Sequence, residues 1–221
     1  MTTFRSHALG YKAAQTLYYA IGEQAERIGF PFTHSVTLNF SETAVDPWDA
    51  IGVFSKLRLR RFAPWLRRPR KFAGPAVPPT YAFVFENSKD KKPFLTMNPG
   101  DPHNVHVHWL VHIPTERAHD FGHRLYEWLE ELGDGWVSST AIHVRPVFNI
   151  PALGLRPYAL KGTGEAWAEH FGAKAEPQGL IVGGRRSGTS ENLGNRARVT
   201  EDKRRGIFRR LPPGARNKSA A

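Results

Sequence analysis

Apolar and polar residues alternate along several stretches of the chain, and they recur at helical spacing along others. Residues 33–40, 80–86, 105–113 and 140–148 read as β-strands, since side chains two residues apart on a strand share a face. A polar connection that contains Pro and Gly joins the second of these stretches to the third. We therefore expect these two strands to be antiparallel neighbours.

The helical pattern predicts a first helix that ends at Gly29, with Leu17, Ile21, Ala25 and Ile28 on one face. Asp46 can cap a second helix with Pro47 at its first position, and this helix would continue through the basic stretch that follows.

Thr115 is expected to cap a strongly amphipathic helix that Gly133 closes. Its apolar stripe comprises Ala118, Phe121, Leu125, Trp128, Leu129 and Leu132. Further along, Pro157 would open a short segment through Gly162, and residues 165–171 would form one more helix. These elements predict an α+β fold, a central antiparallel sheet of about four to five strands with helices packed on it.

Composition narrows the class of protein. The 221 residues are enough for one medium-sized domain with a real core, and the absence of cysteine excludes disulfide frameworks, thiolate metal sites and cysteine nucleophiles. A metal would have to be bound by histidine and carboxylate. The sequence has neither a signal peptide nor an apolar run as long as a membrane span, so we expect a cytoplasmic protein that makes no contact with a membrane.

The net charge of +11 favours a polyanionic partner, above all nucleic acid. Residues 56–71 contain eight basic and no acidic residues, and residues 185–218 contain eleven basic and three acidic ones, whereas residues 116–134 contain six acidic and two basic ones. The candidate DNA-binding residues in the two basic segments are Arg58, Arg60, Arg61, Arg67, Arg68, Arg185, Arg186, Arg196 and Arg198. Phe62, Trp65 and Phe72 lie among them and could stack on unpaired bases or belong to the core. Such basic runs are equally typical of solvated faces or disordered tails.

Four of the ten histidines fall within residues 103–112. On a strand, His106 and His108 project to the same side, so their imidazoles can converge on one divalent cation. Glu86 closes the preceding strand and could supply a third ligand, while His112 lies further along the same face. Manganese, magnesium or zinc would suit these donors. A histidine in this position can also be a packed or surface residue without a metal.

Tyr158 and Lys161 are three residues apart, so on one helical turn they share a face. An ammonium beside a phenol favours the phenolate, which is the nucleophilic form. The ordinary alternative is a tyrosine that packs on the core beside a solvated lysine.

The order of three motifs resembles that of HUH endonucleases, specifically the single-tyrosine initiators of rolling-circle replication. The motifs are the strand VTLNF (residues 36–40), the pair His106 and His108 around Val107, and Tyr158 followed by Lys161 three residues later. The glycine-rich residues 183–194 are also similar to a segment of initiators from small bacterial plasmids and phages.

The resemblance implies that His106, His108 and Glu86 bind magnesium or manganese, that Tyr158 is the nucleophile, and that Lys161 assists it. It implies a metal-dependent enzyme that nicks and rejoins single-stranded DNA at a replication origin through a 5′-phosphotyrosine, with host polymerase and helicase as indirect partners. We further expect three parts of the chain: an N-terminal helical segment in residues 1–32, an HUH-like nuclease domain in residues 33–184, and a basic, partly disordered tail in residues 185–221.

Other interpretations remain open on the sequence. A non-catalytic nucleic-acid-binding protein with structural histidines would carry the same charge. A histidine-triad hydrolase would need a histidine where Leu110 stands, and a β-barrel oxygenase with a His-x-His motif would leave Tyr158 and Lys161 without a role. The chain has no phosphate-binding loop with the sequence GxxxxGK[ST], so we expect no nucleotide cofactor.

Overall fold

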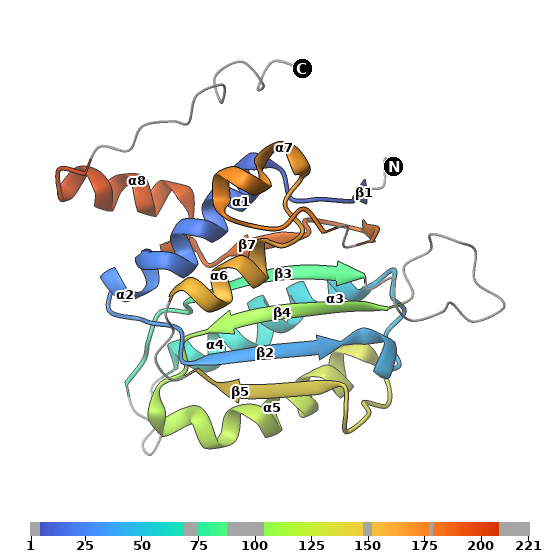
Figure 1. The fold of residues 1–221 in the computed structure, drawn as a ribbon. Coiled ribbons are helices and arrows are strands. Elements are labelled where there is room, and N and C mark those ends of the chain that lie inside the picture. The colour runs from blue at the N-terminus through green and yellow to red at the C-terminus, as the bar shows by residue number, and fades with distance from the viewer. Residues whose placement is uncertain (1–4, 69–74, 88–103, 148–151, 177–178, 208–221) are drawn as a thin grey trace.

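A computed structural model describes residues 5–68, 75–87, 104–147, 152–176 and 179–207 (Figure 1). Its main feature is a five-stranded antiparallel sheet in the order β5-β2-β4-β3-β7, which confirms the predicted α+β class. The strands are β2 (His34–Asn39), β3 (Tyr81–Asn87), β4 (Val105–Val111), β5 (Ile142–Pro146) and β7 (Ser187–Thr189). Two further strands, β1 (Arg5–Ser6) and β6 (Ile181–Val182), form a separate antiparallel pair.

One face of the sheet is covered by α3 (Ala50–Lys56), α4 (Ala63–Arg67) and α5 (Thr115–Gly133), and a π-helical stretch, Leu57–Phe62, joins the first two (Figure 1). Aromatic side chains dominate this core, since the rings of Phe54, Phe62 and Phe121 all pack around Trp109 of β4. The apolar stripe predicted for α5 is buried at Phe121, Leu125, Trp128 and Leu129. The helix ends as expected at Gly133, and Asp134 then adopts a left-handed conformation.

The opposite face carries α1 (Tyr11–Tyr19) and α6 (Ala152–Leu160). After α1, a π-helical stretch (Ala20–Gln24) and α2 (Ala25–Arg27) complete the predicted first helix, and Gly29 follows with a positive φ of 80°. Leu17, Ala82, Val84, Leu110 and Leu160 belong to the apolar cluster on this side. The N-terminal residues therefore pack on the same sheet as the residues after 33, which the predicted boundary at residue 32 did not anticipate.

The remaining helices of the described chain are short. These are the 3₁₀ turns Phe40–Glu42, Glu169–Phe171 and Glu191–Leu193, together with α7 (Glu165–Ala168) and α8 (Asn195–Arg204). None of the helices among the described residues is long and apolar enough to cross a membrane.

Thr115 is the first residue of α5 rather than its cap, since Pro114 occupies the N-cap position. Two predicted helix starts were wrong by more than this. The second helix begins at Ala50 rather than Pro47, because the Asp46 carboxylate accepts the N–H of Trp48 and closes a turn before the helix. Pro157 lies inside α6 and does not open it. The missing N–H of proline removes one helical hydrogen bond, but α6 continues on both sides of it.

The predicted C-terminal tail does not begin at residue 185. Ser187–Thr189 pair with Val84–Ala82 of β3, and the N–H of Phe85 donates to the Arg186 carbonyl. Residues 195–204, expected to be loose from about Thr200, form α8 instead. Asp202 of this helix is buried. Its carboxylate accepts a hydrogen bond from Arg198 and forms an ion pair with Arg27 of α2. Residues 208–221 lie outside the described part.

Candidate functional site

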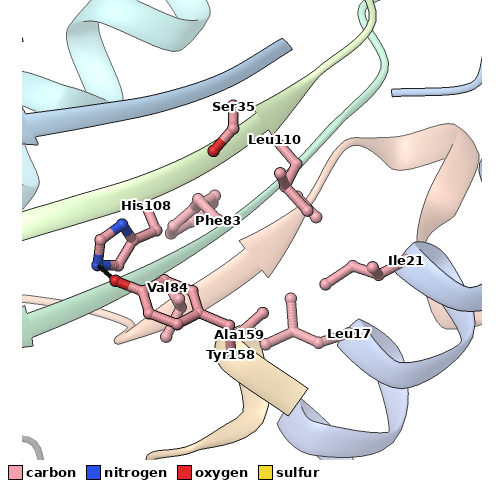
Figure 2. Close-up of a pocket in the computed structure, with 10 residues that line it drawn as sticks. Leu17, Ile21, Ser35, Phe83, Val84, His108, Leu110, Tyr158 and Ala159 are labelled. Atoms are coloured by element: carbon pink, nitrogen blue, oxygen red, sulfur yellow. Dashed lines mark hydrogen bonds between the residues drawn. The ribbon is translucent and has the colours of Figure 1, made fainter. Parts of the chain in front are cut away.

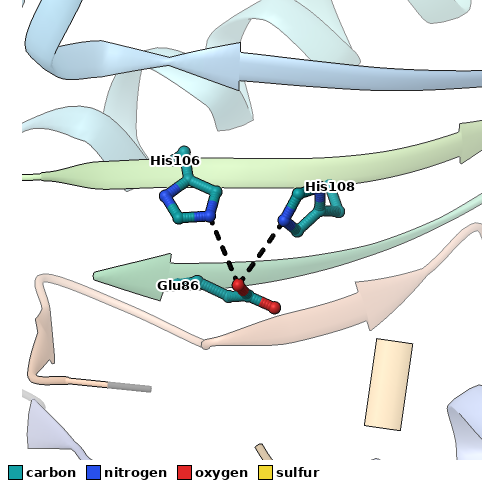
Figure 3. Close-up of side chains that lie close together, drawn as sticks. All are labelled: Glu86, His106 and His108. Carbon is teal, nitrogen blue, oxygen red and sulfur yellow. Dashed lines mark ion pairs between the residues drawn. The ribbon is translucent and has the colours of Figure 1, made fainter. Parts of the chain in front are cut away.

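Three side chains from two neighbouring strands meet on the face of the sheet that carries α6 (Figure 3). In the β3–β4 register Glu86 lies directly opposite His106, and Val84 opposite His108. Glu86 Oε2 is 3.3 Å from His106 Nε2 and 3.5 Å from His108 Nε2. The carboxylate is almost fully buried, with 3% of its side chain exposed. Alternation along β4 places both imidazoles on one side, as the sequence predicts.

Both imidazoles are oriented through their second ring nitrogen. His106 Nδ1 lies 3.2 Å from the carbonyl oxygen of Asn104 and donates to it, and His108 Nδ1 lies 3.1 Å from Thr37 Oγ1 on β2. Partners of this kind hold the ring and direct Nε2 at the cluster. Thr37 and Asn104 were not identified from the sequence. Thr37 lies opposite His108 because of the register between β2 and β4, and the sequence around either residue does not indicate this register.

Tyr158 and Lys161 come to the same place from α6 and the residue just after it. The Tyr158 hydroxyl is 2.9 Å from His108 Nε2, and Lys161 Nζ is 2.8 Å from Glu86 Oε2. Lys161 Nζ also lies 4.3 Å from the centre of the Tyr158 ring. The structure thus brings together all five residues predicted for the catalytic and metal roles.

One side of the Tyr158 ring packs against the protein, and the other side is exposed to solvent. Figure 2 shows its ring beside Ala159, Val84 and His108. The cavity on this side is only about 20 Å³, enough for about one water molecule. Tyr158 is nevertheless 44% exposed, so this side chain is open to solvent on its other side.

Burial and charge act in opposite directions on the carboxyl of this cluster. Burial alone would raise the pKa of Glu86, but the neighbouring His106, His108 and the Lys161 ammonium outweigh it and hold the pKa far below its ordinary value. Glu86 is therefore ionised at neutral pH. The pKa of Lys161 is raised, because bonding to Glu86 outweighs the burial of its ammonium.

His108 and Tyr158 are kept neutral in the absence of other ligands. Burial lowers the pKa of His108, and the attraction of Glu86 only partly compensates. Burial and the negative charge of Glu86 raise the pKa of the Tyr158 phenol, against the opposing effect of Lys161. A neutral imidazole has a lone pair that can bind a metal, and in His108 this lone pair would have to exchange the Tyr158 hydroxyl for the ion.

The donor set of Glu86, His106 and His108 fits a divalent cation. Their ligand atoms lie within 4.8 Å of one another, and each residue offers one donor. A carboxylate held ionised and two imidazoles oriented by second partners are the chemistry such sites require. The buried group can therefore bind a metal ion.

His112, the other histidine that shares this strand face, has a different environment. Its Nδ1 lies 2.7 Å from the Pro31 carbonyl oxygen and its ring packs edge-on against Phe30, so it is held at the far end of β4. His103 lies outside the described residues.

The predicted DNA-binding arginines divide into two groups. Arg60, Arg67, Arg68, Arg185 and Arg196 are exposed. The others contact protein groups: Arg58 donates to the Tyr81 hydroxyl, Arg61 pairs with Glu131, Arg186 donates to the Phe85 carbonyl, and Arg198 pairs with Asp202.

Arg186 is the extreme case, with 3% of its surface exposed. Its guanidinium donates to a backbone carbonyl of β3 and is too buried to contact a polyanion. Phe62 and Trp65 are buried in the aromatic core and do not stack on bases, and Phe72 lies outside the described residues.

Comparison of the chain with protein-family models, with curated proteins and with solved structures finds no match.

Proposed function

We propose that this protein is a metal-dependent endonuclease that nicks and rejoins single-stranded DNA through a phosphotyrosine. The observation that carries the proposal is the 2.9 Å contact between the Tyr158 hydroxyl and His108 Nε2. It puts an accessible phenol at the edge of a metal-binding cluster, with a lysine next to both. In this respect the site resembles the HUH initiators of rolling-circle replication.

The reaction is a transesterification at one phosphate of the DNA strand. A bond forms between the Tyr158 oxygen and phosphorus, the bond from phosphorus to the 3′ oxygen breaks, and that oxygen leaves with a proton as a 3′-hydroxyl. The product is a 5′-phosphotyrosine, which preserves the energy of the phosphodiester, so the reverse reaction rejoins strands without ATP. A host polymerase could extend the 3′-hydroxyl, with a host helicase opening the duplex ahead.

Each residue of the cluster has a role in this scheme. Magnesium or manganese on Glu86, His106 and His108 would supply Lewis-acid polarisation of the scissile phosphate. Lys161 stabilises the phenolate of Tyr158 and the charge that develops on the phosphate. The exposed arginines attract the DNA backbone without regard to sequence.

The direct test is formation of a covalent protein–DNA adduct. The protein is incubated with manganese and a random-sequence pool of 40-nucleotide single strands labelled at the 3′ end, because the attack leaves the 3′ fragment on the protein. We expect a labelled protein band on a denaturing gel. It should disappear with EDTA and with Tyr158→Phe.

Tyr126→Phe is the matched control, because the Tyr126 hydroxyl lies on α5 and donates to the Ser139 carbonyl, away from the cluster. It should form the adduct as wild type does. An adduct that survives Tyr158→Phe would remove Tyr158 as the nucleophile. No adduct with any metal, together with retained DNA binding, would support the non-catalytic binding protein instead.

A further inference from the structure

A groove of about 840 Å³ runs along the outer edge of the sheet, between α1, α3 and strand β7. Figure 1 shows α1 and α3 on opposite sides of the sheet at this edge. The wall from β7 carries Ser187, Gly188 and Thr189, and further hydroxyls come from Thr16 and Ser55. The proposed chemistry of Tyr158 makes no use of this groove.

The groove is positively charged. Lys12, Arg58 and Arg185 line it, against the single carboxylate of Glu191, and none of the three forms an ion pair within the described ranges. Arg58 stacks on Phe54, Tyr81 and Phe83, which fixes its guanidinium beside the groove. Cationic side chains that line a groove and have no carboxylate partner favour the binding of an anionic ligand.

The edge of β7 also offers backbone N–H donors to the groove. The carbonyl of Arg186 and the N–H of Ser190 bond to β3, so in antiparallel pairing the alternate residues Ser187 and Thr189 direct their backbone groups away from β3, toward the open edge. Backbone N–H groups and hydroxyls are common partners of phosphate oxygens.

The groove also lies close to Tyr158. Leu17 of α1 borders both the groove and the small cavity beside the Tyr158 ring. The groove and the Tyr158 ring are therefore on neighbouring parts of the molecule, on either side of this buried side chain.

We infer that this groove binds the phosphate backbone of single-stranded DNA and holds a part of the substrate that flanks the cleaved phosphate. The volume is in the range of small-ligand sites and fits a few nucleotides of one strand. The inference builds on the proposed nicking reaction, but groove binding can be measured without it.

The first experiment compares charge reversals inside and outside the groove. Lys12→Glu and Arg185→Glu change exposed groove residues, while Lys174→Glu and Arg145→Glu change exposed residues that do not line it and are not among the candidate DNA-binding arginines. Fluorescence anisotropy with labelled dT16 should show at least tenfold weaker binding for the groove double variant than for the control double variant. The slope of log K against log salt should fall by about 1.4, which is two phosphate contacts of a single strand.

The second experiment uses the absence of cysteine from the chain. Thr189→Cys places one thiol in the groove, and Lys174→Cys places one elsewhere. An oligo-dT that carries a thiol-reactive disulfide should attach to the Thr189→Cys variant several times faster than to the Lys174→Cys variant. Free dTMP in excess should not compete at concentrations where unlabelled dT16 does.

Equal losses of affinity in the two double variants, or equal attachment at the two positions, would overturn the groove assignment. Competition by dTMP as strong as that by dT16 would also overturn it, in favour of a mononucleotide site. Tyr158→Phe should leave both groove measurements unchanged. Failure of adduct formation with intact groove binding would therefore count against the nickase alone.

Discussion

Glu86 Oε2 is the atom on which the candidate site converges. Two imidazole nitrogens and the Lys161 ammonium all lie within 3.5 Å of it. A divalent cation would have to share this oxygen with the ammonium, and like charges at such distances repel. Lys161 would therefore compete with a metal ion for this oxygen, while in the proposed reaction it also assists the phenol of Tyr158.

This competition predicts opposite effects of one substitution. Lys161→Met should raise the affinity for Mn²⁺ severalfold, because it removes the repulsion, and it should lower the rate of adduct formation at least tenfold, because the cation beside the phenol is lost. Isothermal titration with Mn²⁺ and the gel assay measure the two effects. Lys161→Arg should restore part of the rate, and a loss of Mn²⁺ affinity in Lys161→Met would contradict the competition.

His34 is a residue through which acid should lower the stability of the fold. Burial lowers the pKa of His34 on β2, and the nearby His112 lowers it further. The ring faces Phe121 of α5, and its Nδ1 lies 3.0 Å from Thr33 Oγ1. The unfolded chain therefore binds a proton at His34 at a higher pH than the folded protein does.

As the pH falls through the ordinary histidine pKa of 6.5, the unfolded state gains this proton first, so the free energy of unfolding should decrease. One such group changes it by at most about 1.4 kcal/mol per pH unit. Urea unfolding of the metal-free protein at pH 7.5, 6.5 and 5.5 measures the slope. His34→Gln should give a shallower slope between these values, and an unchanged slope would show that other groups set the acid response.

At the scale of elements, α5 is anchored by a charged side chain that no apolar pattern reveals. Arg117 in its first turn is 1% exposed and donates to the carbonyls of Trp65, Arg68 and Pro75. These bonds tie α5 to the end of α4 and to the segment that leads into β3. The basic residue thus works as a clamp between helices, although it lies in the acidic part of the sequence.

Arg117→Ala should lower the free energy of unfolding by about 3 kcal/mol, because it leaves buried carbonyls without their donors. Arg124→Ala on the same helix is the control. It removes only an exposed pair with Glu127 and should cost less than about 0.5 kcal/mol. Chemical denaturation measures both, and similar costs for the two variants would show that the clamp is not a major support of the fold.

The elements also differ in how far local pattern reveals them. β2, β4 and α5 have strong apolar periodicity and were predicted close to their observed bounds. Ser187–Thr189 contain no apolar residue, and their strand exists because the edge of β3 accepts them. The start of α6 was missed because Pro157 is a helix-breaking signal that the observed helix tolerates.

At the scale of the whole molecule, the sheet separates two kinds of structure. The α3–α5 face is filled with aromatic rings and supports stability, while the opposite face carries the cluster around Glu86 and the α6 residues over it. The groove at β7 lies at the edge between them. The positive charge of the chain is thus used in two ways, on exposed arginines and in contacts such as those of Arg58 and Arg186.

The sequence by itself determined strands β2, β3, β4 and β5, the amphipathic helix and the common direction of His106 and His108, because these follow from the two-residue and 3.6-residue periods of neighbouring side chains. Only the tertiary structure decided that Tyr158 and Lys161 lie over Glu86, that Thr37 orients His108, and which arginines point inward. Those outcomes depend on strand register and on how α6 packs against the sheet. They are set by contacts between residues far apart in the chain, on which local spacing carries no information.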